Sequence, residues 1–156
     1  MSNSAHFLMR AISLLFVLLS LTWAPLVRAQ MFATVQECDA RYGKPTAPTD
    51  QTSDVRFYKN EGMSIKILFV DNKAAVITYT SLTSLKLSKE LEKKLLELSA
   101  AGNTWEEIEG EGAQTWRRSD GLAFAICDAT NGELNLFSTD YIEKSKAEVQ
   151  TAINQQ

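Results

Sequence analysis

The chain has 156 residues and a formal net charge of −3, and 45% of its residues are hydrophobic. This length suits a single domain with a core of its own. A mildly acidic balance without a basic stripe disfavours nucleic-acid binding, since polyanions are bound by clustered Lys and Arg.

The first segment, residues 1–29, has the pattern of a secretory signal peptide. Arg10 is followed by an apolar run over residues 11–24, and Val27 and Ala29 occupy the two positions that a signal peptidase reads. We therefore expect cleavage after Ala29 and a secreted or periplasmic protein.

An uncleaved membrane anchor is the alternative interpretation of this segment. The apolar run has only 14 residues, whereas a spanning helix needs about 20. Pro25 and Arg28 lie where such a helix would have to continue. Lipid attachment is disfavoured because the first cysteine, Cys38, does not directly follow the run. We expect no stable membrane span in the mature chain.

Cleavage also changes the chemistry that remains. It removes His6, which is the only histidine, and two of the 16 basic residues, so the formal charge falls from −3 to −5. Without histidine, Ser-His-Asp and Cys-His catalysis and metal sites that need imidazole are excluded. We predict a mature protein that is not an enzyme and needs no cofactor.

The exported domain, residues 30–156, is predicted to begin with a helix. Thr34 and Glu37 have the spacing of a capping box. Gly43 is a typical helix stop, and Pro45 prevents the helix from resuming.

A three-stranded antiparallel meander is expected next. Met63, Ile65, Ile67 and Phe69 alternate with more polar residues, which is typical of a half-buried strand. The predicted strands are residues 55–59, 63–69 and 74–80.

The second half is predicted to repeat this order. Its helix is expected to begin at Ser88 and to bury a stripe of Leu87, Leu91, Leu95 and Leu98. The expected elements after it are a loop over residues 105–113 and strands over residues 115–118, 122–127 and 134–138.

Two signals define the end of this half. Asn131-Gly132 is a strong hairpin turn. A last helix is expected over residues 140–154, with a capping box at Asp140 and with Ile142, Val149 and Ile153 turned inward.

An ungapped shift of 59 residues aligns the two halves at the glycines that end helices and form turns. It places Gly43 on Gly102 and Gly62 on Gly121. We therefore predict half-repeats over about residues 34–82 and 88–139, with coincidence of ordinary turn chemistry as the alternative. The predicted fold is α+β: about six antiparallel strands in two meanders with helices on one face.

The segment Tyr42-Gly43-Lys44-Pro45, between a helix and a loop that leads into a meander, resembles small exported domains of the SmpA/OmlA outer-membrane assembly type. Doubled, this element order resembles the tandem architecture of β-lactamase inhibitor proteins. The chain departs from the lipoprotein pattern because no lipid-accepting cysteine follows the signal. The resemblance implies a non-enzymatic protein-binding module.

Cys38 and Cys127 are the cysteines of the chain. An even pair in an oxidising compartment favours a disulfide. This bridge would close a loop of about 90 residues and contribute roughly 4 kcal/mol in the chain-entropy model. Two buried free thiols are the alternative.

Exposed aromatic residues mark binding faces, and four are candidates here: Trp105, Tyr58, Tyr79 and Trp116. Arg117 is a further partner-binding candidate, since it or Arg118 beside Lys59 would make a small basic spot. The alternatives are core packing for the aromatic residues and solubility for the arginines.

The function predicted from the sequence is an exported module that binds another protein through an open sheet face or the Trp105 loop. One alternative is a domain that binds a small ligand in a cleft between the halves, or a cation such as Ca²⁺ at the carboxylates of Glu106, Glu107, Glu109 and Glu111. A hydrolase built on paired carboxylates is a third interpretation.

Overall fold

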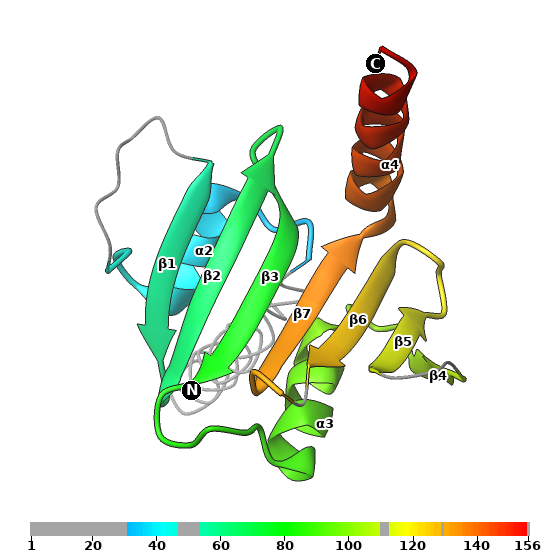
Figure 1. The fold of residues 1–156 in the computed structure, drawn as a ribbon. Coiled ribbons are helices and arrows are strands. Elements are labelled where there is room, and N and C mark those ends of the chain that lie inside the picture. The colour runs from blue at the N-terminus through cyan, green and yellow to red at the C-terminus, as the bar shows by residue number, and fades with distance from the viewer. Residues whose placement is uncertain (1–30, 47–53, 110–112, 129, 156) are drawn as a thin grey trace, which may run out of the picture.

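The computed structural model describes residues 31–46, 54–109, 113–128 and 130–155, so the predicted cleavage after Ala29 lies outside the described residues. In chain order the elements are helix α2 (Val35–Tyr42), strands β1 (Val55–Asn60), β2 (Met63–Val70) and β3 (Lys73–Ser81), helix α3 (Lys89–Ser99), strands β4 (Trp105–Ile108), β5 (Gln114–Arg118), β6 (Ala123–Asp128) and β7 (Glu133–Ser138), and helix α4 (Thr139–Asn154). These elements form an α+β fold around one antiparallel sheet (Figure 1). None of the helices described is both long and apolar enough to cross a membrane.

The sheet joins two meanders through its centre. The strand order is β1-β2-β3-β7-β6-β5-β4, and every neighbouring pair is antiparallel. The class and the two meanders were predicted correctly, but the described residues form seven strands rather than about six.

The additional strand is β4, which lies in the segment predicted as a loop. It pairs with β5 from Trp105↔Arg118 to Ile108↔Thr115. The prediction missed it because its glutamates resemble a solvated loop, although an edge strand tolerates charged residues along its exposed side.

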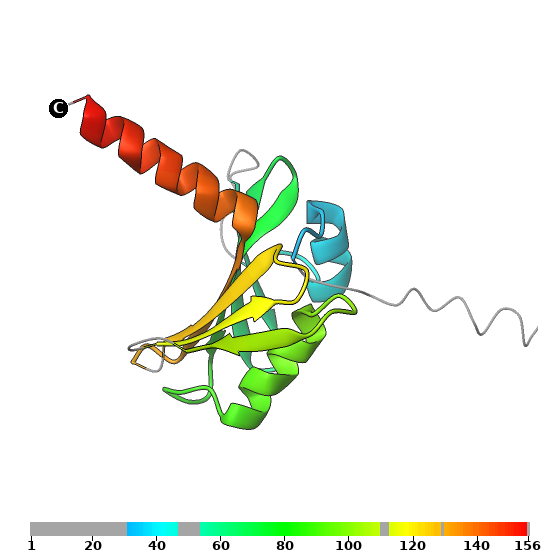
Figure 2. The same cartoon turned by 90° about the vertical axis from the view of Figure 1, so that its right-hand side faces the viewer.

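Helices α2 and α3 cover one face of the sheet (Figure 2). The side chains that alternate inward along the strands pack against them, because successive strand residues point to opposite faces. The core on this face includes Tyr58, Ile65, Ile67, Ile77, Tyr79, Trp116, Leu134 and Leu136.

The predicted helix starts of α2 and α3 are confirmed. Thr34 caps α2 in a complete capping box, in which the Thr34 amide donates to the Glu37 carboxylate at 2.7 Å. Gly43, with a φ of 82°, ends this helix. Ser88 caps α3 by accepting a hydrogen bond from the amide of Leu91 at 3.2 Å.

The predicted leucine stripe of α3 is partly wrong. The buried residues are Glu92, Leu95, Leu96 and Ser99, which share one helix face at spacings of three and four. Leu98 is 42% exposed instead. The stripe was misplaced because leucine spacing alone does not show which edge of an apolar face meets the sheet.

Helix α4 was predicted incorrectly in two respects. Its N-cap is Ser138 rather than Asp140, and it buries none of its residues, with Val149 and Ile153 each 60% exposed. Because α4 begins directly after β7, no turn returns it over the core. It projects away from the sheet on the side opposite α2 and α3 (Figure 2).

The strand register relates the two meanders by an approximate two-fold arrangement. Ile77, on β3, pairs with Leu136, on β7, at the centre of the sheet, and these residues are 59 positions apart. The corresponding cross-strand rows are Arg56–Ile67–Ile77 in one half and Trp116–Ala125–Leu136 in the other.

The ungapped shift is therefore one residue off in two of the three strands. It aligns Phe57 with Trp116, yet Phe57 is 38% exposed and Trp116 is buried. A slip of one residue exchanges the faces of a strand. The duplication itself stays a prediction.

The predicted disulfide is not formed. Cys38 and Cys127 are both buried free thiols. Cys38 is on α2, which packs against β1, whereas Cys127 is on β6, four strands from β1 in the sheet. Two cysteines can be bridged only when their Cα atoms are closer than about 7 Å.

Candidate functional site

The face of the sheet opposite α2 and α3 carries a row of apolar side chains. We call this surface the open face. Cross-strand pairing brings together one outward, half-buried residue from each of five adjacent strands. We call these residues the apolar row: Val55, Leu68, Val76, Phe137 and Phe124. The row continues into the ion pair of Arg117 with Glu106, whose charged atoms are 4.0 Å apart.

The next row across the open face is mainly polar. At its centre Thr78 donates a hydrogen bond to the side-chain oxygen of Asn135 at 2.8 Å. One row further, Thr80 donates to Glu133 at 3.4 Å. The open face thus has an apolar row beside a polar centre, while Phe57 and Ile108, at the two ends of the neighbouring row, are exposed.

Helix α4 extends from the apolar side of this face. It begins two residues after Phe137. Ile142, Val149 and Ile153 lie on one side of the helix by their spacing, and the last two are largely exposed. The apolar row and α4 thus form adjoining apolar surfaces.

Three of the five predicted partner-binding residues, Tyr58, Tyr79 and Trp116, are core residues, and Tyr79 is 1% exposed. Tyr58 is fully buried, and its hydroxyl donates to Asp39 at 2.8 Å. Trp116 is 7% exposed and packs on the helix-covered face. Neither Tyr58 nor Trp116 is available to a partner, because the alternation of β1 and β5 turns both inward.

Trp105 is a half-buried residue that packs against the core. Its indole Nε1 donates to the carbonyl of Leu96 on α3 at 2.8 Å. This contact fixes β4 to α3, and it corresponds to the core-packing alternative.

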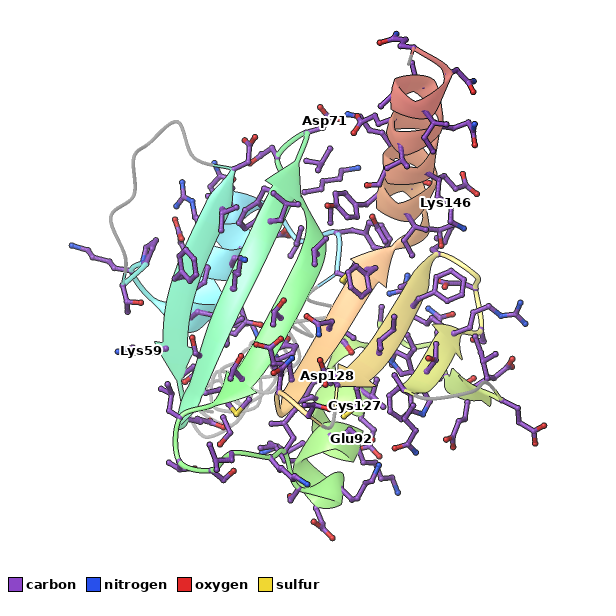
Figure 3. All side chains as sticks on the ribbon, in the orientation of Figure 1. Lys59, Asp71, Glu92, Cys127, Asp128 and Lys146 are labelled. Atoms are coloured by element: carbon purple, nitrogen blue, oxygen red, sulfur yellow. The ribbon has the colours of Figure 1, made fainter. Side chains whose placement is uncertain are left out.

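Arg117 lies on the open face and Arg118 is buried, as their alternation predicts. The predicted basic spot with Lys59 is wrong. Lys59 is on the edge strand β1 (Figure 3), and β5 is five strands away across the sheet.

The glutamates of the predicted acidic loop do not converge. Glu106 faces Arg117, whereas the adjacent Glu107 points to the other side of β4 and accepts a hydrogen bond from Gln114 at 2.9 Å. Glu111 lies outside the described residues. Within the described ranges, no group of three His, Cys, Asp or Glu residues is placed to hold a metal ion.

A groove of about 270 Å³ separates α2 from α3 on the helix-covered face. Its lining residues come from both helices and from β1, the β1–β2 turn, β2 and β3: Arg41, Tyr42, Asn60, Glu61, Met63, Ile65, Tyr79, Leu91, Lys94, Leu95 and Leu98. The groove therefore lies between the two predicted half-repeats, where the small-ligand alternative expected a cleft.

Two tyrosine hydroxyls meet at this groove. The hydroxyl oxygens of Tyr42 and Tyr79 are 3.5 Å apart. Burial raises the pKa of Tyr42 to about 12 and raises that of Tyr79 well above its usual range. Both phenols are therefore neutral at physiological pH.

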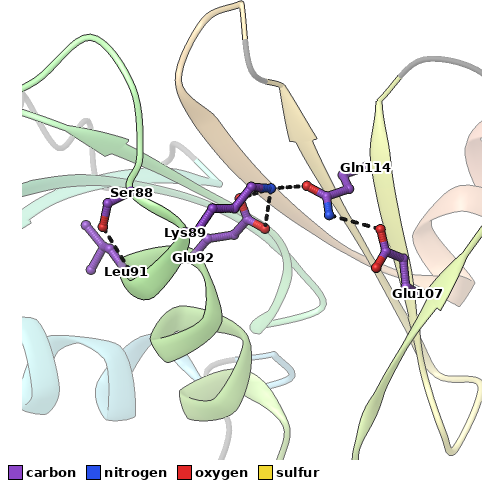
Figure 4. Close-up of polar contacts among 6 residues, drawn as sticks. All are labelled: Ser88, Lys89, Leu91, Glu92, Glu107 and Gln114. Atoms are coloured by element: carbon purple, nitrogen blue, oxygen red, sulfur yellow. Dashed lines mark hydrogen bonds and ion pairs between the residues drawn. The ribbon is translucent and has the colours of Figure 1, made fainter.

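A polar network lies at the other end of α3, beside a pocket of about 570 Å³. The ammonium of Lys89 lies 3.4 Å from the buried carboxylate of Glu92 and also donates to Gln114, which in turn donates to Glu107 (Figure 4). Through Gln114 on β5, the network connects α3 to β4.

Cys127 lies beside Glu92 and Asp128 in this region (Figure 3). Burial and, next, the hydrogen bond with Glu92 raise the pKa of the Cys127 thiol to about 11. Burial likewise raises the pKa of Cys38 to about 11. Because the thiolate is the reactive form, neither cysteine is activated as a nucleophile.

The residues of the open face were not predicted from the sequence, although a pattern in the strands indicated an apolar outer face. The strands contain continuous apolar segments such as ILFV and AFAI. Uninterrupted apolar runs indicate strands with apolar residues on both faces. For the groove, the sequence indicated a cleft between the halves but not its lining residues, since α2 and α3 are distant in the chain.

Comparison with known proteins gives little likeness. No family model matches the chain. No curated protein matches it either. The crystal structure of a DUF4309 family protein, YjgB from Bacillus subtilis, is similar over 69% of this chain and 79% of that chain, with 15% sequence identity and a TM-score of 0.39.

Proposed function

We propose that the mature chain is an exported, non-enzymatic module that binds another protein through its open face. The observation that supports this function best is the apolar row, which lies on the face that α2 and α3 leave open and which α4 adjoins along β7 and β3. Export rests on the predicted signal peptide.

A protein partner fits the form of this surface. The apolar row crosses five strands, or about 19 Å at 4.8 Å per strand. Its polar neighbours form hydrogen bonds with each other, so an apolar centre adjoins a satisfied polar margin. Protein interfaces have this arrangement of apolar core and polar rim.

Affinity capture tests the proposal. The purified mature chain is immobilised, exposed to envelope or medium extract from its source with cross-linking, and the retained proteins are identified by mass spectrometry. The same is done with Leu68→Lys/Phe124→Lys on the open face. Leu82→Lys/Leu85→Lys is the matched control, because these leucines are exposed away from the apolar row. Circular dichroism verifies that each variant is folded.

We expect a defined protein to be retained by the wild type and by the control. The open-face variant should retain it at least about tenfold less, as expected for interface residues worth 1.4 kcal/mol or more. Absence of any reproducible partner after cross-linking would contradict the proposal. A purified chain that dimerises through the same residues would also contradict it, because the open face would then serve self-association.

A further inference from the structure

We propose that the groove between α2 and α3 binds a small anionic amphiphile, specifically a carboxylate with a short apolar tail. The site is on the helix-covered face, so it does not depend on the proposed protein partner. Its size, its apolar floor and the charges at its rim carry the inference.

The floor of the groove is apolar and firmly held. Met63, Ile65 and Leu95 line it and are 6%, 3% and 6% exposed. Leu91 and Leu98 contribute from α3, and Leu98 is 42% exposed. An apolar tail in the groove would cover the leucine that the fold leaves exposed, which is favourable by about 25 cal/mol per Å².

The volume limits the ligand. A space of about 270 Å³ corresponds to about nine water molecules at 30 Å³ each. It is slightly below the range of about 300–1,000 Å³ for drug-sized ligands. A carboxylate of about ten non-hydrogen atoms, such as octanoate, suits this volume.

The charges at the groove favour an anion. Arg41 comes from α2 and Lys94 from α3, and neither forms an ion pair within the described part of the chain. Arg41 lies over the ring of Tyr42 at 5.6 Å from its centroid. Glu61 is the one carboxylate among the groove's lining residues, so the formal charge of the lining is +1.

The tyrosine pair adds a neutral donor. The hydroxyls of Tyr42 and Tyr79 are 3.5 Å apart, and one of the two protons suffices to join them. The other proton remains available, since each phenol can donate once. A carboxylate accepts such a hydrogen bond in addition to its ion pairs.

Titration of octanoate into the purified mature chain by isothermal calorimetry tests the site. Octanol has the same tail without the charge, and octylamine has the opposite charge. We expect octanoate to bind at least tenfold more tightly than either. Comparable affinity for octanol, tighter binding of octylamine, or no octanoate binding up to about 10 mM would overturn the proposal, and these comparisons use only the wild-type protein.

Charge-removing variants locate the binding. Arg41→Gln/Lys94→Gln should weaken octanoate binding about 10- to 100-fold, as for hydrogen bonds to charged groups. Lys93→Gln is the matched control, because Lys93 precedes Lys94 but lines a different pocket. Equal effects of the double variant and of this control would overturn the assignment to the groove, provided that circular dichroism shows each variant to be folded.

Discussion

Arg118 is a buried cation at the end of β5, with only 2% of its surface exposed. Its Nε and Nη2 atoms each lie 2.9 Å from a carboxylate oxygen of Asp120, and its guanidinium lies over the ring of Phe32 at 5.4 Å from the centroid. Nη1 has no hydrogen-bond partner within the described residues. Stability here thus depends on Asp120, because an unpaired buried charge is costly.

We predict that Asp120→Asn lowers the free energy of unfolding by roughly 3 kcal/mol at pH 7, the magnitude typical of removing one partner of a buried pair. The hydrogen bond from Arg118 holds the pKa of Asp120 below its usual range. A lowered folded-state pKa gives stability that is present above the unfolded pKa of about 4 and is lost as the pH falls through the folded pKa. The difference between wild type and variant should therefore shrink below about pH 4.

Urea unfolding between pH 3 and pH 7 measures both effects. Glu106→Gln is the matched control, since Glu106 pairs with the exposed Arg117 and the side chains are 60% and 55% exposed. An exposed pair contributes about 0–1 kcal/mol. Equal losses in the two variants, or a loss from Asp120→Asn that stays constant with pH, would show that Asp120 does not hold Arg118 in this way.

At the scale of the elements, the turns between strands determine how closely neighbouring segments can pack. The β6–β7 turn is an example, because Gly132 has a φ of 65° and lies against the segment between β3 and α3. A Cβ at this position would collide with the backbone carbonyl of Leu85. Gly121, in the β5–β6 turn, has a similar φ of 73° but no neighbouring atom within 4 Å of such a Cβ.

Alanine substitutions at these two glycines distinguish the cost of backbone strain from the cost of steric overlap. Gly121→Ala should cost about 1 kcal/mol for the left-handed backbone alone. Gly132→Ala should cost about 3 kcal/mol, because overpacking adds 1–3 kcal/mol and a backbone carbonyl cannot move aside easily. Urea unfolding of the two variants measures the difference. Equal losses would mean that the β3–α3 segment does not pack on this turn.

At the scale of the whole molecule, local sequence patterns predicted the elements better than their partners. The alternation from Met63 to Phe69 predicted β2 because a half-buried strand requires it, and Thr34 with Glu37 predicted the start of α2 because capping is local. The spacing of Val149 and Ile153 correctly indicated an apolar helix side. It contained no information on what that side contacts, so α4 was wrongly placed against the core.

The candidate site follows the same rule. The opposite orientations of Arg117 and Arg118 were predictable from alternation, whereas the burial of Tyr58 rather than Phe57 depended on which face α2 and α3 cover. The groove required both helices to be placed in three dimensions. The orientation of a residue within one strand or helix could therefore be predicted from the sequence. A surface formed by several strands and helices could not.

The two meanders should unfold together, since one core cluster extends across both and β3 pairs with β7 at their junction. In a chain expressed as residues 30–156, the tryptophans are Trp105 and Trp116, both in the second half. Their fluorescence therefore reports on that half, while far-UV circular dichroism reports on both. We expect the two urea transitions to coincide, as in two-state unfolding. Ile77→Ala, in the first half, should shift both transitions by the same 2–5 kcal/mol that is typical of such core truncations.

Lys66→Ala is the control for this substitution, because Lys66 is exposed on β2 and such surface changes are usually within about 0.5 kcal/mol. If Ile77→Ala shifted the circular dichroism transition but left the fluorescence transition in place, the halves would be independent folding units. The central β3–β7 pairing would then connect two halves that are each stably folded without the other. Coincident shifts would instead mean that each half needs the other to complete its core.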